Sequence, residues 1–309
     1  MKKTFKFILK LLVSLGFVAW IIFRTNWSDV ITNIGRIKIW QIAIYIIVVL
    51  IGMVISAYKW KMLAEHKKIN HPLKDFFKFY LAGSFINNFM PSFIGGDTYR
   101  AYQIGNAEKK YVEAASTVLI DRITGFVGAS ILVMLFSLIN FKVIMQNKIL
   151  ILINLLLLLS LFFDVLIDNA RKLSFRPRIS KYIPDKIVEL MKELDQYSNG
   201  SGILSRAVTW SVLFAVVGVA GANYVLFWSL GVKIDILNYL SVIFLISIVS
   251  AIPISINNIG IKEWAYVTFF GFFGVSSSVV IAIAIISRFL QMILSFFALP
   301  VYIKSKEVI

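Results

Sequence analysis

Charged residues interrupt several apolar stretches of the sequence, where ionised side chains are rarely placed. They are Asp97, Arg100, Asp121, Arg122, Lys262, Glu263 and Arg288. A charge near the centre of a bilayer costs about 2.5–3.5 kcal/mol on insertion scales, so such residues usually face a protein interior and take part in function. Four of these charges are positive and three are negative. Pairing among them offsets most of the cost and leaves one positive charge for an anionic ligand.

The four cations of this set have the chemistry to bind a phosphate group. The guanidinium of arginine is a planar fork that matches phosphate oxygens, and a helix that begins after a glycine points N–H groups at an anion. We therefore assign binding of a lipid headgroup or its phosphate to Arg100, Arg122, Arg288 and Lys262. The alternative is that Arg122 and Arg288 pair structurally and hold two parts of the chain together.

The three carboxylates, Asp97, Asp121 and Glu263, either balance those charges or bind a cationic headgroup. The chain has no cysteine and only two histidines, His66 and His71, both in a polar connection. A zinc site would need ligands that cluster better than this. The sequence also lacks a nucleophile–base pair and a nucleotide-binding loop. We therefore assign no catalytic residue, no metal and no cofactor.

Two apolar stretches, about 76–105 and 236–273, are broken by residues that do not suit a helix interior. The breaks read "NNFMPSFIGGDTYRAY" (87–102) and "AIPISINNIGIKEWAY" (251–266). Proline ends a helix because it lacks an N–H and clashes with the preceding turn, whereas glycine permits a turn and a close backbone approach. The paired asparagines would satisfy freed backbone groups or bind headgroup hydroxyls. The residues expected to shape the breaks are Pro91, Gly95, Gly96, Pro253 and Gly260.

The composition is typical of a membrane protein. Hydrophobic residues make up 59% of the chain and the mean hydropathy is +0.83, far above the values of soluble chains. The net charge of +16 is explained by Lys and Arg on cytoplasmic loops, where they would attract anionic lipid headgroups rather than nucleic acid. The sequence thus predicts an all-α polytopic membrane protein with full spans at about 8–23, 39–57, 116–140, 149–167, 203–230 and 279–303.

The distribution of positive charge predicts the topology. Basic residues are enriched on cytoplasmic loops, which places the N-terminus, the 58–75 connection and the 168–202 loop inside. The stretch 76–105 must then cross the membrane an even number of times, yet its two limbs of about ten to fifteen residues are too short for full spans. We expect a re-entrant helical hairpin there, entering from inside, and a second one at 236–273, entering from outside. Both chain ends are expected in the cytoplasm.

The two halves of the chain follow the same plan in opposite orientations. Each has a span, a broken hairpin that carries proline, glycine and then charges, and a second span with an arginine. Inverted repeats of this kind build many transporters, whose broken helices meet near the bilayer midplane. The sequence predicts one integral membrane domain, 1–309, with repeat 1 at about 39–140, a connecting span at 149–167, a cytoplasmic loop at 168–202 and repeat 2 at about 203–303.

Two segments outside the apolar runs are also expected to form helices. Residues 24–38 fit a short interfacial helix. Residues 185–197 place Ile187, Leu190, Met191 and Leu194 on one helical face. That face is expected to lie against the inner membrane surface or against the protein.

The sequences "FMPSFIGGDTYRAY", "LIDRITGF" and "IPISINNIGIKEW" resemble the transmembrane region of lysylphosphatidylglycerol synthases, a flippase-like family of integral membrane proteins. The resemblance covers nearly the whole chain. In bifunctional members this region moves aminoacylated phosphatidylglycerol across the bilayer, and a separate cytoplasmic domain makes that lipid. Because the sequence ends at Ile309, we expect a stand-alone member, with a separate lipid-modifying enzyme as a possible partner, in the cell membrane and, in a bacterium, the inner membrane.

The resemblance implies translocation of an anionic or phosphate-linked lipid by a flippase or scramblase. An aminoacylated phospholipid and a polyprenyl-phosphate glycolipid are both compatible with it. The alternatives are a membrane-embedded subunit of a lysyl- or glycosyltransferase, or a structural partner of envelope machinery. If the protein translocates lipid, family names that refer to lysyl transfer would mislead, because the sequence carries no catalytic motif of its own.

Overall fold

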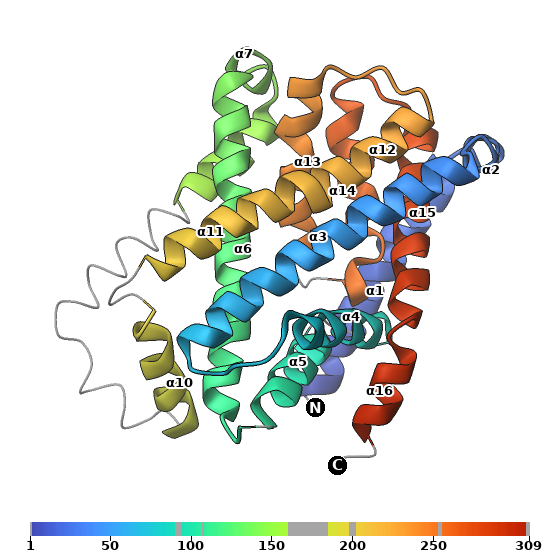
Figure 1. The fold of residues 1–309 in the computed structure, drawn as a ribbon. Coiled ribbons are helices and arrows are strands. Elements are labelled where there is room, and N and C mark those ends of the chain that lie inside the picture. Colours follow the sequence, from blue (N-terminus) through green and yellow to red (C-terminus); the bar gives the residue numbers. More distant parts are fainter. Residues whose placement is uncertain are drawn as a thin grey trace.

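The computed structural model describes residues 2–89, 94–106, 108–159, 185–197, 202–252 and 255–306, and within them the fold is all-helical (Figure 1). Four segments are long and apolar enough to cross a membrane: α3 (Ile39–His66), α6 (Tyr111–Ile139), the run from α11 through η2 to α12 (Ile203–Ser229), and α15 (Ser277–Phe296). A fifth candidate combines Leu11–Arg24 with α2 (Trp27–Gly35) across a bend of 86°. The expected all-α polytopic architecture is confirmed at this level.

The other helices are shorter or lie outside these candidates. Of the predicted span 149–167, the described part belongs to the apolar helix Lys148–Leu159, and its remainder falls outside the described residues. The third candidate span consists of α11 (Ile203–Phe214), η2 (Ala215–Gly221) and α12 (Ala222–Ser229). The remaining elements are α1 (Lys2–Arg24), which contains Leu11–Arg24, and α4 (Leu73–Phe89), α5 (Ile94–Asn106), α7 (Phe141–Ile144), α10 (Asp185–Asp195), α13 (Ile236–Ala251), η3 (Ile256–Asn258), α14 (Ile261–Gly271) and α16 (Leu299–Lys306).

Two helix pairs occupy the positions of the predicted breaks. In the first pair α4 packs on α5, and in the second α13 packs on α14. Each second helix also packs on the long helix that follows it, α5 on α6 and α14 on α15. Figure 1 shows the first pair in the lower half of the molecule, where α16 and the start of α1 also lie, and the second pair in the upper half. The two pairs therefore lie toward opposite ends of the helical bundle.

The first long helix of each half crosses the other at a pair of glycines. A Cβ atom added to Gly52 of α3 would lie 2.6 Å from the Cα atom of Gly218 in η2. Real Cβ atoms do not approach a backbone so closely, so the crossing depends on the absence of a side chain. This contact brings the two halves of the chain together where α3 and the α11–η2–α12 run lie side by side (Figure 1).

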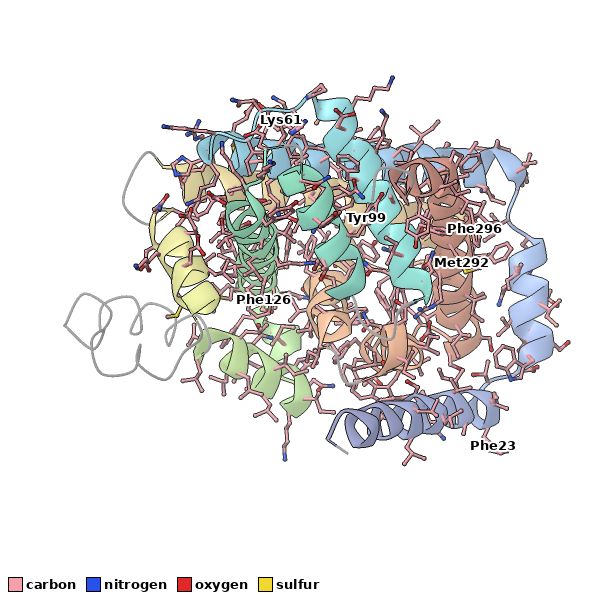
Figure 2. All side chains as sticks on the ribbon, turned by 90° about the horizontal axis from the view of Figure 1, so that it is seen from below. Phe23, Lys61, Tyr99, Phe126, Met292 and Phe296 are labelled. Atoms are coloured by element: carbon pink, nitrogen blue, oxygen red, sulfur yellow. The ribbon has the colours of Figure 1, made fainter. Side chains whose placement is uncertain are left out.

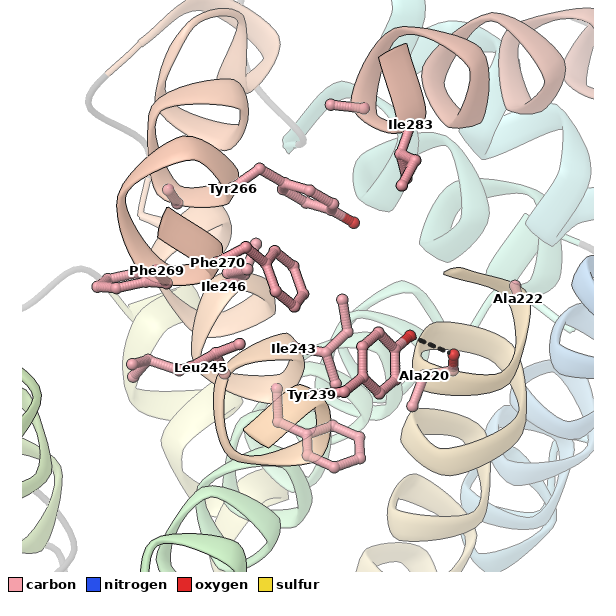
Figure 3. Packing of buried hydrophobic residues seen from close by; sticks show 14 of the residues in the cluster. Ala220, Ala222, Tyr239, Ile243, Leu245, Ile246, Tyr266, Phe269, Phe270 and Ile283 are labelled. Carbon is pink, nitrogen blue, oxygen red and sulfur yellow. Dashed lines mark hydrogen bonds between the residues drawn. The ribbon is translucent and has the colours of Figure 1, made fainter. Parts of the chain in front are cut away.

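Side chains satisfy the backbone around the π-helical turn η2. The Tyr239 hydroxyl donates to the carbonyl of Ala220 at 2.6 Å (Figure 3). The Asn223 amide donates to the carbonyl of Val219 at 2.8 Å. The Tyr266 hydroxyl in turn donates to the Asn223 side-chain oxygen at 2.6 Å. A π-helical turn inside an α-helix is often found at a functional site. Here these hydrogen bonds fix η2 against α13 and α14.

The long helices turn their apolar side chains outward as well as inward. On α3, Ile47, Ile51 and Val54 are exposed, while Lys59 on the opposite face is buried. Phe23, at the end of α1, is 90% exposed and projects away from the bundle (Figure 2). An apolar exterior around buried polar groups is the arrangement that a lipid solvent favours.

The two predicted polar helices are both present. Helix α2 begins at Asn26, whose side-chain oxygen accepts from the backbone N–H of Ser28 at 3.1 Å. Helix α10 lies against the protein, because the Lys67 ammonium contacts the Glu193 carboxylate at 2.7 Å and the Tyr197 hydroxyl donates to the Leu63 carbonyl at 3.1 Å. Of the two positions expected for α10, the structure therefore has the one against the protein.

Candidate functional site

A cavity of about 830 Å³ lies between the two helix pairs. Both halves of the chain contribute to its wall, including α3, η2 and α15. The charged side chains that line it are those of Asp97, Arg122, Lys262 and Arg288. Most predicted charged residues thus come together in one place, although they are far apart in the sequence.

Asp97 and Arg122 form a two-pronged ion pair at the first helix pair. The Asp97 oxygens accept from Arg122 Nε at 2.8 Å and from Arg122 Nη2 at 3.0 Å. Arg100 Nη2 also donates to Asp97, at 2.8 Å. The Arg122 side chain is nevertheless 52% exposed. Asp97 therefore holds the planar guanidinium in a fixed orientation at the cavity wall.

Glu263 and Arg288 form the corresponding ion pair at the second helix pair. Glu263 Oε1 accepts from Arg288 Nε at 3.1 Å and from Nη2 at 2.9 Å. The same guanidinium donates to the backbone carbonyls of Asn257 at 3.1 Å and Asn258 at 3.2 Å. Arg288 therefore satisfies carbonyl groups that the irregular backbone of η3 leaves free, and it joins α15 to the broken segment.

The two ion pairs have the same separation in sequence. In each, the acid precedes its arginine by 25 residues. Three matched pairs also share one offset of 166 positions along the chain: Gly52 with Gly218, Asp97 with Glu263, and Arg122 with Arg288. Equivalent contacts thus recur at equivalent places in the two halves.

A second group of charges lies behind the cavity wall. Asp121, 5% exposed, forms ion pairs with Lys59 at 2.9 Å and with Arg100 at 3.4 Å. Lys59 Nζ also donates to the backbone carbonyl of Asp121 and to Ser211 Oγ, both at 2.9 Å. The Arg100 guanidinium lies 4.9 Å from the ring centres of both Trp60 and Tyr80. Neither Arg100 nor Asp121 lines the cavity, so both support it from behind.

Lys59 is a site residue that the sequence analysis missed. The span predicted at 39–57 ends before Lys59, which leaves this residue in the 58–75 connection that is expected inside. Helix α3 continues to His66, which carries Lys59 into the interior at 3% exposure. The available signal was spacing: Ser56 and Lys59 follow Gly52 at helical intervals on one face.

Lys262 differs from the other cations of the site. Its ammonium donates to Ser287 Oγ at 3.2 Å and lies 5.8 Å from the centre of the Tyr266 ring. Within the part of the chain that the structure describes, no carboxylate oxygen forms an ion pair with it. Lys262 thus brings a positive charge to the cavity wall without a paired acid.

The hairpin-shaping glycines have distinct positions. Gly95 and Gly96 lie in the first turn of α5 rather than in the connection before it. The Gly96 N–H donates to Asn87 Oδ1 at 2.8 Å, and an added Cβ would lie 2.2 Å from the Gly83 carbonyl oxygen. Gly96 therefore permits close contact of α4 and α5, and Asn87 satisfies a freed backbone group.

Gly260 begins α14 with a φ of +86°, which L side chains rarely adopt. A Cβ there would lie 2.3 Å from Phe17 Cβ of α1. The Gly260 N–H donates to Glu263 Oε2 at 2.8 Å. This hydrogen bond joins the start of α14 to the ion pair between Glu263 and Arg288.

The two predicted prolines, Pro91 and Pro253, lie outside the described residues. Among those described, no three His, Asp or Glu side chains come together as metal ligands would.

Comparison with known proteins identifies the family to which the chain is similar. The family model described as "Lysylphosphatidylglycerol synthase TM region" matches residues 7–298. The chain is also 24% identical, over 271 residues, to the UPF0104 membrane protein MJ1595 of Methanocaldococcus jannaschii. That match covers 81% of this chain and 80% of the archaeal protein. Because the family match includes nearly the whole sequence, the chain belongs to the family of the lysylphosphatidylglycerol synthase transmembrane region.

Proposed function

We propose that the protein moves an anionic, phosphate-linked lipid across the cytoplasmic membrane. The cavity between the two helix pairs carries the proposal, because arginines from both halves of the chain face into it. Each arginine is held by a carboxylate in a two-pronged ion pair, and a fixed, partly exposed guanidinium is well suited to phosphate oxygens. The lipid headgroup would occupy the cavity while its acyl or prenyl chains remain in the surrounding bilayer.

The proposed topology is an inverted repeat of two halves. In it, the α4–α5 and α13–α14 pairs are re-entrant hairpins that enter from opposite sides, with about six full spans around them. The common offset of the matched glycines, acids and arginines supports this arrangement, as does the location of the two pairs toward opposite ends of the bundle (Figure 1). A site at a repeat interface can be opened to either side by rocking one half against the other.

The charge balance favours an anionic ligand more strongly once Lys59 is included. The site then has five basic and three acidic residues: Lys59, Arg100, Arg122, Lys262 and Arg288 against Asp97, Asp121 and Glu263. Two positive charges remain, which would suit the oxygens of a lipid phosphate, whether it is a monoester or a diester. Because the sequence has no nucleotide-binding loop, the lipid would move down its gradient or with a coupled ion.

The proposed partners are the membrane lipids themselves. The chain ends and α10 would face the cytoplasm, where the exposed Lys68 and the partly exposed Lys61 would contact anionic headgroups. A separate enzyme would make or use the transported lipid. The orientation of the chain ends follows from the proposed topology, and the separate enzyme is suggested by the bifunctional members of the family.

Reconstitution in lipid vesicles tests the proposal. A fluorescent polyprenyl phosphate is placed in both leaflets, and the fraction that a membrane-impermeant quencher reaches is followed over time. Vesicles with the wild-type protein should expose the inner-leaflet probe, and Arg288→Gln should slow this by about tenfold or more because a charged hydrogen-bond partner is lost. Arg24→Gln, an exposed arginine at the end of α1, is the matched control. Exposure no faster than in protein-free vesicles would overturn the proposal.

An activity assay of the same purified protein distinguishes lipid transport from lipid modification. Incubation with a lipid acceptor and a labelled lysyl or glycosyl donor should leave the lipid chemically unchanged. Turnover of the donor by the purified chain alone would show a lipid-modifying enzyme and contradict a transporter without catalysis.

A further inference from the structure

The two halves of the site differ at one position behind the ion pairs. Asp121 in the first half and Ser287 in the second are 166 positions apart in the sequence. This is the same offset that separates Arg122 from Arg288, the residues that follow them. Asp121 forms ion pairs with two buried cations, Lys59 and Arg100. At the corresponding place Ser287 offers Lys262 only a hydroxyl oxygen, at 3.2 Å. Each half therefore keeps one positive charge beyond its acids, but only in the second half does a described cation of the site, Lys262, form no ion pair with a carboxylate.

The carboxylates of the site are engaged by partners of the protein itself. Asp97 accepts from Arg122 and Arg100. Glu263 accepts from Arg288 and from the N–H of Gly260. Of the described residues, Asp97 is the one carboxylate that lines the cavity. An ammonium group in the cavity would thus meet cations of the wall and would have to compete with Arg122 for Asp97.

Uncharged hydrogen-bonding groups make up the rest of the polar wall. Two of them are buried without a hydrogen-bond partner among the described residues, Ser250 Oγ and Asn258 Oδ1, the latter in a residue 9% exposed. A buried amide oxygen without a partner is costly, and the other amide and hydroxyl groups of the wall offer both donors and acceptors to the hydroxyls of a ligand. The uncharged polar residues of the wall are Tyr80, Ser84, Asn87, Asn88, Asn223, Ser247, Ser250, Asn257, Asn258, Tyr266, Gln291 and Ser295.

We infer that the cavity selects a lipid phosphate whose headgroup beyond the phosphate is uncharged and hydroxylated, such as a sugar, and that Lys262 binds the phosphate. The inference rests on the proposed function and narrows its substrate. The phosphate lies on the side of the second helix pair, where Lys262 and Arg288 both reach the cavity wall. The hydroxyl groups lie against the asparagines and serines. A cationic aminoacyl headgroup is disfavoured, because its ammonium would face Lys262, Arg122 and Arg288 with no unpaired carboxylate beside it.

Binding to the purified full-length chain in lipid nanodiscs tests this selectivity. The probes are polyprenyl phosphate, a polyprenyl-phosphate hexose, phosphatidylglycerol and lysylphosphatidylglycerol, each measured by competition for one labelled polyprenyl phosphate. The hexose lipid should bind most tightly, and phosphatidylglycerol should bind at least about tenfold more tightly than its lysyl ester. Inorganic phosphate and a soluble hexose phosphate are measured alongside, and competition by them at the concentrations of the lipids would assign the site to a soluble anion and overturn a lipid site.

Substitution of Lys262 tests the position of the phosphate. Lys262→Met should weaken the binding of polyprenyl phosphate by about tenfold or more, because the loss of a charged hydrogen-bond donor has an effect of this size. Lys262→Arg should restore most of the affinity. Lys233→Met, in the exposed connection between α12 and α13, is the matched control, and the melting temperature of each variant separates binding from folding.

The outcomes distinguish this inference from the proposed function. Tighter binding of the lysyl ester than of phosphatidylglycerol, or unchanged affinity in Lys262→Met, would overturn the inference while lipid movement in vesicles could still be intact. If none of the four lipids binds and none moves in vesicles, the proposed function fails and this inference fails with it.

Discussion

Carboxylates orient both arginines of the cavity. Asp97 contacts Arg122 through Nε and Nη2, and Glu263 contacts Arg288 through the same two atoms. Each acid lies near the start of a helix, α5 or α14, and each arginine lies on the next long helix. The acids therefore join short and long helices, and this explains why the charges are tolerated in apolar surroundings.

Asp121 is predicted to be important for stability, because it lies between two buried cations. Asp121→Asn would leave Lys59 and Arg100 short of their counter-charge. The free energy of unfolding should fall by about 3–5 kcal/mol, as when one member of a buried ion pair is removed. Chemical unfolding in detergent measures the change.

Lys59→Met combined with Asp121→Asn provides the control for this prediction. Removing the cation together with its acid should lower stability by less than the sum of the two single changes. Equal stability of Asp121→Asn and the wild type would contradict the assignment of Asp121 as a buried counter-charge.

Unusual charges could be predicted from the sequence, because a charge within an apolar run is costly wherever the run folds. The depth of these charges behind the cavity wall could not be predicted from the sequence. Arg100 follows Asp97 by one helical turn, and the rings of Trp60 and Tyr80, which come from two other helices, enclose it. Lys59 was missed because the end of a helix depends on tertiary contacts that local hydropathy does not contain.

The broken helices of the two pairs depend on glycine in different ways. Gly96 lets α5 approach α4, whereas Gly260 adopts a backbone conformation that side chains disfavour. The positions of both breaks could be predicted, because proline and glycine interrupt an apolar run visibly. The crossing at Gly52 and the π-helical turn η2 could not, because glycine in an apolar helix carries no signal of what it will contact.

Gly52→Ala is predicted to destabilise the crossing of α3 and η2. The added methyl group would overlap the Gly218 backbone, and overpacking of this kind costs about 1–3 kcal/mol. Gly271→Ala is the matched control, since an added Cβ there meets nothing within 4 Å and should change stability by less than about 0.5 kcal/mol. Thermal unfolding in detergent compares the two. A Gly52→Ala variant as stable as the control would show that the helices do not cross so closely.

On the scale of the whole molecule, residues from both helix pairs and from the long helices line one shared cavity. The distribution of positive charge and the recurrence of a broken hairpin predict two halves in opposite orientations, and the orientation of the halves in the membrane stays a prediction. The cavity itself could not be predicted, because it is lined by residues from as far apart as Val49 and Ser295. Its volume depends on how the halves pack.

Labelling of single cysteines tests the proposed topology, and the chain has no native cysteine. Asn106→Cys lies at the end of α5 and Lys233→Cys in the connection that follows α12. In intact cells or oriented vesicles, a membrane-impermeant thiol reagent should reach Lys233→Cys from outside and Asn106→Cys from inside. Lys61→Cys, on α3, marks the inside. Labelling of Asn106→Cys from outside alone would contradict the inverted hairpins.

The central claim is that the cavity between the two helix pairs holds a lipid phosphate. Mass spectrometry of the protein purified in mild detergent tests it most directly, by identifying and counting the lipid that remains bound. The wild type and the surface variant Arg24→Gln/Lys233→Met are predicted to retain a phosphate-containing lipid, and Lys262→Met/Arg288→Gln to retain about tenfold less. Equal retention by the cavity variant, or a bound lipid without phosphate, would contradict the account.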